Sequence, residues 1–333
     1  MTPGVDDSTL DAFSKRVIRL IIDQMRDRSF QFKPTGKEFL PKANGKIRPL
    51  GIPPLIDKVV QEAIGMLLEP VFEPRMVDES YGFRPGRSAH LALRTIRRKW
   101  TGTTWLIEGD LKGYFNNINH KILASLLMRR VKDQQIIDLY WKLVWAGFVN
   151  NGTREPYTLT RVPPGGILSP LLSNIYLHEF DVWMKNLAAS FGAPGKLPGR
   201  DKYLRRLNQM ANLRERAKVQ RTTNRELKEQ ILWLEKRKRL RPSTVHVGTK
   251  IDYVRYADDW VIGVTGPKNL AVKIKDNVKE FLTKELKLEL NKERSKITHL
   301  ATERGRFLGT LISARNNKYA ESLWLRNKPG HKV

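Results

Sequence analysis

Hydrophobic and polar positions along the chain follow two different spacings. Apolar residues recur at helical spacing over residues 8–30, 55–72 and 171–187, which predicts three helices, the second of them buried. Residues 39–53 and 253–264 each combine two β-prone runs with a tight turn, which predicts two hairpins. Smaller pieces are a buried strand at residues 104–110, a helix at 270–286 and a last hairpin at 305–312. The chain is therefore a mixture of helices and hairpins without an internal repeat.

The second hairpin carries two adjacent carboxylates, Asp258 and Asp259, at its tip. Neighbouring like charges repel, so a cation beside them would explain the pair. An ordinary soluble turn is the alternative, because Asp also favours turns through local hydrogen bonds. The strand at residues 104–110 ends on Asp110, which can meet the hairpin tip at one sheet edge. Three carboxylates without His or Cys suit Mg²⁺, and a pair of such ions about 4 Å apart serves in-line phosphoryl displacement.

The charge balance narrows the class of partner. The chain has 61 Lys and Arg against 34 Asp and Glu, a net charge of +27, while 40% of its residues are hydrophobic. A globular protein this basic most often binds a polyanion, which favours nucleic acid. No apolar run is long enough to span a bilayer, and the acidic, polar N-terminus is not a signal peptide. The absence of cysteine excludes disulfides, zinc ribbons and thiol catalysis.

Much of this charge lies in one segment. Residues 185–250 contain 18 Lys and Arg against 5 Asp and Glu. A thin apolar stripe runs through them, which predicts a basic helical hairpin inserted between two core elements. A solvated face is the common interpretation of a charge run. At this density, however, repulsion between like charges favours a bound polyanion.

Several blocks in the chain resemble those of a known family. Tyr256-Ala257-Asp258-Asp259 matches the YxDD signature of reverse transcriptases, and the surrounding order of blocks resembles group II intron-encoded reverse transcriptases (maturases). The matching stretches are residues 46–53, 81–88, 110–115, 164–175, 253–259 and 307–309, which together span about residues 37–312. A lone YxDD signature is weak evidence, whereas these blocks in this order are specific.

The resemblance implies an α+β, right-hand polymerase fold with fingers and palm, an antiparallel palm sheet flanked by helices, and no thumb in these residues. It implies an N-terminal extension and fingers at residues 1–104, and a palm with the remaining fingers helices at 105–333, including the basic insertion at about 185–250. We expect the natural protein to continue beyond Val333.

The resemblance also assigns roles to individual residues. Asp110, Asp258 and Asp259 would be catalytic and metal-binding, with the Leu111 carbonyl as a further ligand, and Phe115 would exclude the ribose 2′-hydroxyl unless it is an ordinary core aromatic. The nucleotide-binding set would be Lys42, Lys46, Arg48, Phe115, Gly165 and Gly166. The nucleic-acid-binding set would be Arg84 and Arg87 on the template, with Arg205, Arg206, Arg214, Arg216, Lys236, Arg237, Lys238 and Arg239 in the insertion.

Two positions depart from the family pattern. Pro164 stands where the family usually has Gln, so that a side-chain contact to the nucleotide is missing or replaced. Arg294-Ser295 stands where the family often has Lys-Thr. A Lys could protonate the leaving pyrophosphate, but an Arg stays charged and is a poor acid.

The resemblance implies an RNA-directed DNA polymerase that copies RNA with two Mg²⁺ ions, or Mn²⁺, and also binds intron RNA as a splicing cofactor. The implied partners are group II intron RNA, an RNA template with a DNA or RNA primer, and dNTPs, without a membrane; a homodimer stays open, and the expected location is the bacterial cytoplasm. Two alternatives are an RNA-binding maturase with little polymerase activity and a retron or diversity-generating type of reverse transcriptase.

Overall fold

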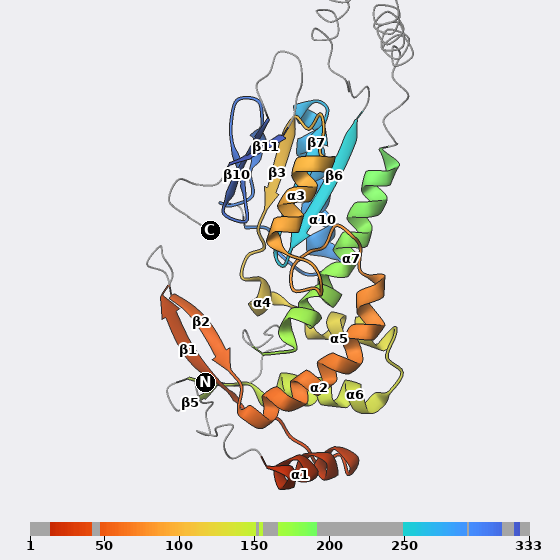
Figure 1. The fold of residues 1–333 in the computed structure, drawn as a ribbon, viewed down its shortest axis with the longest axis vertical. Helices are drawn as coiled ribbons and strands as arrows, with labels where there is room; N and C mark the ends of the chain where they lie inside the picture. Colours follow the sequence, from red (N-terminus) through yellow and green to blue (C-terminus); the bar gives the residue numbers. More distant parts are fainter. Residues whose placement is uncertain are drawn as a thin grey trace, which may run out of the picture.

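The computed structural model describes residues 14–41, 47–150, 153–155, 166–191, 249–291, 293–314 and 323–326 (Figure 1). The helices are α1 (Lys15–Arg26), α2 (Leu55–Phe72), the 3₁₀ turn η2 (Glu73–Arg75), α3 (Ala89–Lys99), α4 (Tyr114–Asn117), α5 (His120–Met128), α6 (Gln134–Ala146), α7 (Ser169–Ser190) and α10 (Lys268–Lys284). The strands are β1 (Thr35–Pro41), β2 (Ile47–Ile52), β3 (Trp105–Gly109), β4 (Phe148–Asn150), β5 (Thr153–Glu155), β6 (Lys250–Tyr256), β7 (Asp259–Thr265), β8 (Ile297–His299), β9 (Gly305–Phe307), β10 (Thr310–Ala314) and β11 (Leu323–Arg326). The mixture of helices and hairpins expected from the sequence is confirmed.

An antiparallel sheet, the core sheet, has the strand order β6-β7-β3-β8. Its strands are covered on both faces, because side chains alternate between two hydrophobic clusters. Ile107 and Ile262 face the cluster that contains α7 and α10, whereas Leu106 and Val261 face the cluster that contains α3. Figure 1 shows α3 in front of this sheet and α10 behind it. Burial on both faces explains why the two central strands, β3 and β7, are mostly apolar in sequence.

Helices α2, α5 and α6 form the other half of the described structure, and α7 runs from them to the core sheet (Figure 1). Helix α7 is buried along much of its length, including Leu172, Tyr176, Phe180 and Met184. It packs on α5 at one end and on β6 at the other. One long apolar helix therefore fixes the position of the core sheet relative to the helical half.

A second sheet, with the order β2-β1-β4-β5, stands apart from the core sheet (Figure 1). Strands β1 and β2 pair antiparallel from Gly36↔Ile52 to Pro41↔Ile47, which confirms the hairpin expected at residues 39–53. Its tip, with Lys42 and Lys46, lies outside the described residues. Strand β4 joins β1 in parallel and comes from beyond residue 104, so this sheet draws on both of the expected domains.

The last expected hairpin is also present, as β9 and β10 joined by Leu308 and Gly309. Both turn residues have left-handed backbone angles, with φ of 49° and 75°. Strand β11 pairs with the outer edge of β10.

The first helix ends earlier than the apolar spacing predicts. Helix α1 stops at Arg26, and residues 1–13 lie outside the described part. The Asp27 carboxylate accepts a hydrogen bond from the Ser29 N–H at 2.8 Å, and Arg28 takes a left-handed φ of 64°. This local turn competes with continuation of the helix.

Among the described helices, none has the length and apolar character needed to cross a bilayer.

Candidate active site

The hairpin β6–β7 places its two carboxylates at one edge of the core sheet. Tyr256 pairs with Asp259, so Ala257 and Asp258 form a two-residue turn. Ala257 has a φ of 56°, in the left-handed region that residues with a Cβ rarely adopt. The turn is therefore held by its surroundings rather than by its own preference.

Asp110 reaches the same edge from the neighbouring strand. Gly109 pairs with Trp260 across β3 and β7, and Asp110 is the next residue of its chain, opposite Asp259. The Trp260 indole lies against Gly109, since a Cβ added there would be 2.0 Å from Trp260 Cζ2. Only glycine permits this packing. The register confirms the expectation that Asp110 and the hairpin tip meet at one sheet edge.

The negative charges at this edge affect one another. Asp259 is exposed, yet the surrounding strands remove part of the water from its carboxylate. This desolvation, followed by the charges of Asp258 and Asp110, raises the pKa of Asp259 to about 6, against a smaller lowering by Arg294. Crowding of carboxylates disfavours the charged form, and a bound cation would relieve it.

Asp110 is held by residues of the segment that follows α10. The main-chain N–H of Asn291 donates to the Asp110 carbonyl at 2.9 Å, and its side-chain Nδ2 donates to Asp110 Oδ2 at 2.8 Å. Arg294 Nη1 lies 3.4 Å from the same oxygen, while 59% of the Arg294 side chain is exposed. Arg294 therefore stands at the carboxylate site, paired through a long and solvent-accessible contact.

The donor set at this edge consists of carboxylate oxygens, which suit Mg²⁺. Within the described residues, no three His, Cys, Asp or Glu side chains are gathered closely enough to hold a metal ion by themselves. Mg²⁺ commonly uses one or two carboxylates and completes its shell with water and substrate phosphates. The residues thus fit a metal that binds together with a phosphate-bearing substrate, rather than a preformed protein cage.

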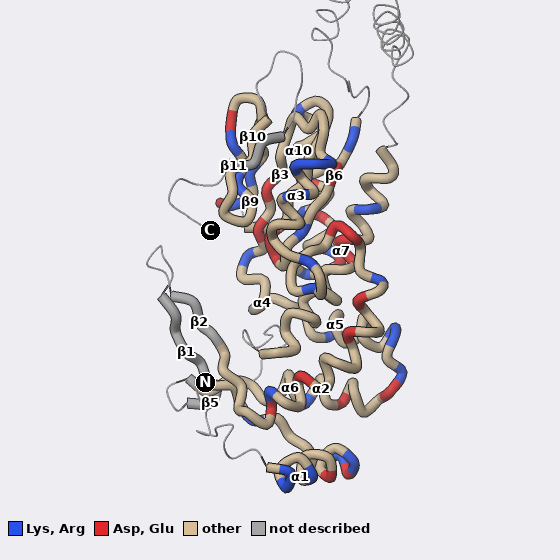
Figure 2. The backbone as a smooth tube through the Cα atoms, in the orientation of Figure 1, with Lys and Arg blue, Asp and Glu red and all other residues tan. Residues whose placement is uncertain are grey.

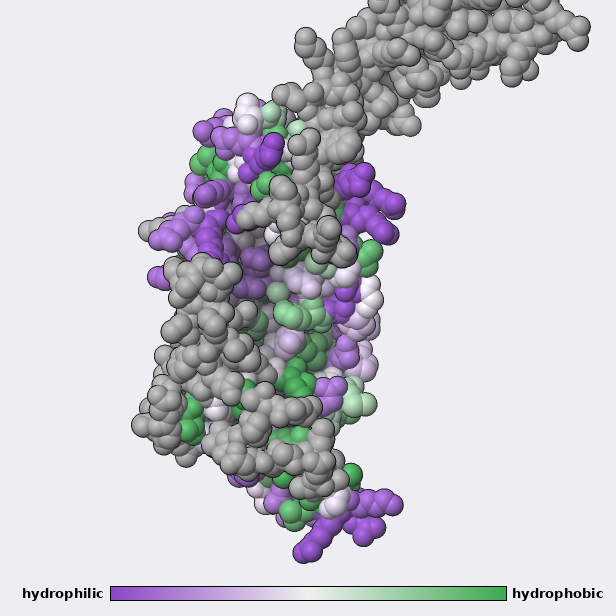
Figure 3. Space-filling model, turned by 60° about the vertical axis from the view of Figure 1, so that its left-hand side comes forward, coloured by the Kyte–Doolittle hydropathy of each residue, from purple (hydrophilic) through white to green (hydrophobic). Residues whose placement is uncertain are grey.

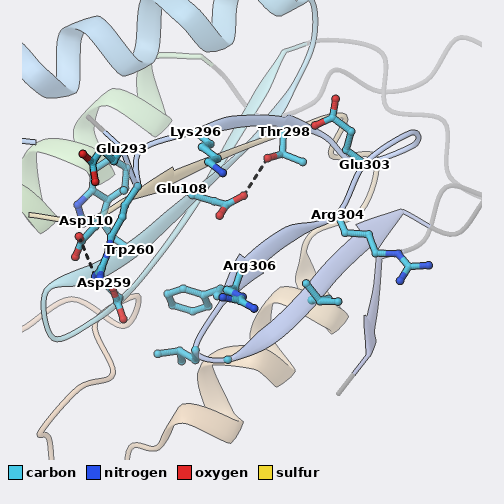
Figure 4. A pocket seen from close by; sticks show the side chains of 16 residues that line it. Glu108, Asp110, Asp259, Trp260, Glu293, Lys296, Thr298, Glu303, Arg304 and Arg306 are labelled. Atoms are coloured by element: carbon cyan, nitrogen blue, oxygen red, sulfur yellow. Dashed lines mark hydrogen bonds and ion pairs between the residues drawn. The ribbon is translucent and has the colours of Figure 1, made fainter. Parts of the chain in front are cut away.

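A cleft of about 720 Å³ extends from the carboxylates toward the β9–β10 hairpin (Figure 4). Asp110, Asp259 and Trp260 line one end, and Phe307 and Leu308 line the hairpin side. Its basic lining residues are Arg294, Lys296, Arg304 and Arg306, and its other acidic ones are Glu108, Glu293 and Glu303. A cleft with this lining can bind phosphate groups next to the carboxylate edge.

Glu108 lies in this cleft, two residues before Asp110 on the same face of β3 (Figure 4). Its Oε1 accepts a hydrogen bond from Thr298 Oγ1 at 2.9 Å. Burial raises the pKa of Glu108, against a lowering by the bonds from Thr298 and the Arg306 main chain. Glu108 therefore ties β3 to β8 and β9, a role that the sequence did not indicate.

Phe115 lies on the short helix α4, close to the end of β3. It is half-buried, and its ring meets the Tyr114 ring edge to face at a centroid distance of 5.2 Å. Tyr114 is buried and donates its hydroxyl hydrogen to the Ser173 carbonyl at 3.0 Å. Tyr114 thus anchors α4, while Phe115 keeps part of its surface open. Its assignment as a sugar filter stays a prediction.

The basic residue Arg84 does not lie where the sequence suggested. It was expected on the template backbone, but its side chain is only 4% exposed and pairs with Glu73 at 2.9 Å. Its Nη1 also donates to the carbonyls of Val77 at 2.6 Å and Ser80 at 2.7 Å. Moving Arg84 toward a phosphate would remove its hydrogen bonds to the Val77 and Ser80 carbonyls, which lie in the interior. Arg84 therefore shapes the loop and is not a template contact.

Arg87, the second arginine of the loop, is more open. It pairs with Asp78 at 2.7 Å, and 26% of its side chain is exposed. Its guanidinium also lies 5.4 Å from the Tyr81 ring centroid. The pairing holds Arg87 at the surface, and a contact to nucleic acid stays a prediction.

The other predicted site residues fall into three groups. Gly166 is buried just before α7, and Arg48 lies on β2, where only its main chain is described. Leu111 is buried and forms a bridge with Leu290. Outside the described residues lie Lys42, Lys46, Gly165, Arg205, Arg206, Arg214, Arg216, Lys236, Arg237, Lys238 and Arg239, together with most of the basic insertion.

Sequence reasoning missed three polar residues near the site: Asn291, Asp181 and Arg255. Asp181 and Arg255 are both fully buried and pair at 2.6 Å. One signal was available, since a lone Asp on an apolar helix such as α7 requires a buried partner. Which residue that partner is depends on the tertiary fold.

Comparison with known proteins places these features in a family. The family model described as "Reverse transcriptase (RNA-dependent DNA polymerase)" matches residues 40–193. The "Group II intron-encoded protein LtrA" of Lactococcus lactis subsp. cremoris is 40% identical over 95% of this chain and 53% of its own length. "Protein YkfC" of Escherichia coli is 33% identical over 100% of this chain and 81% of its own. "Nuclear intron maturase 2, mitochondrial" of Arabidopsis thaliana is 30% identical over 74% of this chain and 36% of its own.

Among solved structures, a telomerase from Candida albicans, described in complex with a fragment of telomeric RNA, has a TM-score of 0.51 at 10% identity. That match covers 96% of this chain and 50% of the other. At this identity the likeness concerns the fold alone. The chain spans about half the length of the intron-encoded relative from L. lactis. The sequence relatives, the family model and the carboxylate edge agree, and the chain belongs to the family of group II intron-encoded reverse transcriptases and maturases.

Proposed function

We propose that this chain carries the active site of an RNA-directed DNA polymerase, with the core sheet as the palm of a right-hand fold and the β1–β2 hairpin in the fingers. The observation that supports it most is the meeting of Asp110 with Asp258 and Asp259 at one edge of the core sheet. Membership of the reverse transcriptase family favours nucleotidyl transfer over other phosphoryl chemistry.

Asp110, the Leu111 carbonyl, Asp258 and Asp259 would hold two Mg²⁺ ions. When bound, such ions stabilise charge on the attacking and leaving oxygens of an in-line displacement. The protein contributes the fixed positions of the carboxylates, of which Asp110 is held through Asn291. Its rigid sheet edge avoids reorganisation during the reaction.

Arg294 has a part in this site that differs from that of an acid. Because an arginine side chain is a poor acid in general, we do not assign Arg294 as the proton donor to the leaving group. Arg294 Nη1 lies 3.4 Å from Asp110 Oδ2, a long contact. The Arg294 side chain could therefore leave Asp110 and bind the triphosphate when the substrate arrives. Lys296, Arg304 and Arg306 in the same cleft would take phosphates of a nucleic-acid strand.

Primer extension on an RNA template with dNTPs and Mg²⁺ tests the proposal. We expect the wild-type chain to extend the primer and the Asp258→Ala variant to lose extension. Circular dichroism and thermal unfolding would establish that the variant remains folded. Extension by Asp258→Ala at the wild-type rate would refute the assignment of the carboxylates. An inactive wild type that still binds RNA tightly would instead favour an RNA-binding maturase.

We also propose that the protein binds group II intron RNA as a splicing cofactor. The support is its similarity to intron-encoded and maturase relatives, together with a net charge of +27. Filter binding at moderate salt would compare the intron RNA encoded around its gene with an unrelated structured RNA of equal length. Tighter binding of the intron is expected. Equal affinity for both RNAs would contradict the maturase role and leave a reverse transcriptase of retron or diversity-generating type.

A further inference from the structure

A buried guanidinium lies directly beneath the turn that carries Asp258. Arg255 is the penultimate residue of β6 and is 0% exposed. Its five N–H donors all have acceptors. Nε and Nη2 form a fork onto Asp181 at 2.7 and 2.6 Å, and Nη2 also donates to Ser80 Oγ at 2.7 Å. Nη1 donates to Asn174 Oδ1 at 3.1 Å and to the Ala257 carbonyl at 2.8 Å.

The acid that receives this fork is equally buried. The Asp181 side chain is 0% exposed, and its Oδ1 also accepts a hydrogen bond from the Tyr253 hydroxyl at 2.7 Å. Burial alone would lower the pKa of Arg255, but the charge and hydrogen bonds of Asp181 raise it above its ordinary value. The pair is therefore fully buried and held together by several hydrogen bonds.

The partners of Arg255 belong to three separate segments. Asp181 and Asn174 lie on α7, Ser80 lies in the loop before α3, and Ala257 is the turn residue next to Asp258. Asn174 Nδ2 donates to the Gly82 carbonyl at 2.8 Å, which ties the loop to α7. Gly82 packs against the turn, since a Cβ there would be 2.2 Å from Ala257 N.

The contact from Arg255 stabilises a strained turn. Ala257 has a φ of 56°, which costs free energy for a residue with a Cβ. Such a conformation persists only where the surroundings determine it. The Ala257 carbonyl is bound by a guanidinium that is itself fixed at four other points. Stabilisation alone would not require this arrangement, because apolar residues of similar volume often do as well as a buried ion pair.

We propose that Arg255 is a positioning residue for the carboxylate edge: through Asp181 and α7 it fixes the Ala257–Asp258 turn, and thereby the oxygens that bind metal. The inference rests on the proposed function for its catalytic consequence. The contact by which Arg255 fixes the turn can be tested by hydrogen exchange, without any measurement of activity.

The test compares two full-length variants with the wild type. Arg255→Lys keeps a positive charge that can pair with Asp181. A lysine ammonium lacks the planar fork of the guanidinium, so it cannot bind Asp181 and the Ala257 carbonyl at the same time. Tyr253→Phe is the matched control, because it removes a hydrogen bond to the same Asp181 oxygen and leaves the contact to Ala257 in place. Both variants would be assayed below their unfolding temperatures, with circular dichroism as the check on folding.

Three properties are measured. The first is amide hydrogen exchange of the peptide covering residues 253–262. The second is Mn²⁺ affinity, measured from the electron paramagnetic resonance signal of the free ion, and the third is the rate of RNA-templated primer extension. For Arg255→Lys we expect faster exchange at the turn and a loss of Mn²⁺ affinity of about 10- to 100-fold, the range seen when a group that orients metal ligands is removed. The extension rate should fall by about 100-fold. Tyr253→Phe should stay close to wild type in all three readouts.

Two results would overturn the inference. One is an Arg255→Lys variant whose hydrogen exchange at the turn, Mn²⁺ affinity and extension rate all equal those of the wild type. The other is an equal loss in Tyr253→Phe, which would mean that any damage to the buried cluster has the same effect. If the wild type neither binds Mn²⁺ nor extends a primer, the proposed function fails. Hydrogen exchange at the turn then decides the positioning role by itself.

Discussion

At the scale of single residues, the carboxylates at the edge of the core sheet are held in different ways. Asp110 is bound by Asn291 through both main chain and side chain, and only 14% of its side chain is exposed. Asp259 is exposed, and desolvation with the charges of Asp258 and Asp110 raises its pKa to about 6. Asp110 is thus held at two points, while Asp259 stands in a field of negative charge that attracts a cation.

Phe115 allows a direct test at this scale. If Phe115 is the sugar filter, its replacement by Val leaves space beside the nucleotide sugar. Ribonucleotide incorporation relative to dNTP incorporation should then rise by about 10-fold or more, the discrimination that pocket shape provides. Single-nucleotide extension with matched dNTP and rNTP pairs measures the ratio. Phe115→Tyr, which keeps the ring, should leave it unchanged. A Phe115→Val variant with the wild-type ratio would show that the ring is an ordinary core aromatic.

At the scale of elements, the loop before α3 braces the β6–β7 hairpin. The Tyr81 N–H donates to the Arg255 carbonyl at 2.9 Å, and the Arg255 N–H donates to the Glu79 carbonyl at 2.9 Å. Gly82 follows this short pairing and lies against Ala257. The loop that the sequence suggested as a template contact therefore supports the Ala257–Asp258 turn.

Gly82→Ala tests this support. The added Cβ would meet the Ala257 main-chain nitrogen at 2.2 Å, and no side-chain rotation relieves a clash with backbone. We expect the turn to move and primer extension to slow by about 100-fold, as for a displacement of about 1 Å at a reacting centre. The control is Gly65→Ala in α2, where the nearest atom is Leu168 Cδ1 at 3.8 Å. Equal rates for the two variants would mean that the loop does not position the turn.

Sequence patterns predicted the elements better than their contacts. The apolar spacing placed α2 at residues 55–72, and the two β-prone runs predicted a hairpin with Asp258 and Asp259 at its tip, whereas the turn is Ala257–Asp258 and Asp259 is the first residue of β7. These are local signals, set by period and turn chemistry. Arg84 was misjudged because its surroundings in sequence, Gly and Pro, resemble an exposed loop. Its buried partners come from the chain reversal at residues 73–80. The Asp181–Arg255 pair joins residues 74 positions apart, which no local pattern reveals.

At the scale of the whole molecule, charge is unevenly placed. Figure 2 shows basic positions on α1 and at the end of α3, and the face drawn in Figure 3 has hydrophilic side chains near both ends of its coloured surface with more hydrophobic ones between. The segment 185–250 adds 18 Lys and Arg against 5 Asp and Glu. The proposed function divides this charge between two roles, with the segment 185–250 binding intron RNA and the basic residues of the cleft binding primer and template.

The salt dependence of RNA binding tests this division. Replacing Arg205, Arg206, Arg214, Arg216 and residues 236–239 by Gln should flatten the plot of log affinity against log salt, by about 0.7 in slope for each phosphate that the variant no longer neutralises. Extension of a short primer should remain close to wild type. Loss of extension in parallel with RNA affinity would place the insertion in the catalytic unit instead.

The most direct test of the carboxylate site is the rate of single-nucleotide incorporation on an RNA template by Asp110→Asn, Asp258→Asn, Asp259→Asn and the triple variant. Asn is nearly isosteric with Asp but lacks its charge. If the carboxylates act as one metal-binding unit, each single variant should lose about 10²- to 10³-fold in rate. The triple variant should lose little beyond that, because residues that act as a unit are not additive. A folded single variant that keeps more than about a tenth of the wild-type rate, a change of less than about 1.4 kcal/mol in barrier, would contradict the assignment of these carboxylates to one metal-binding unit.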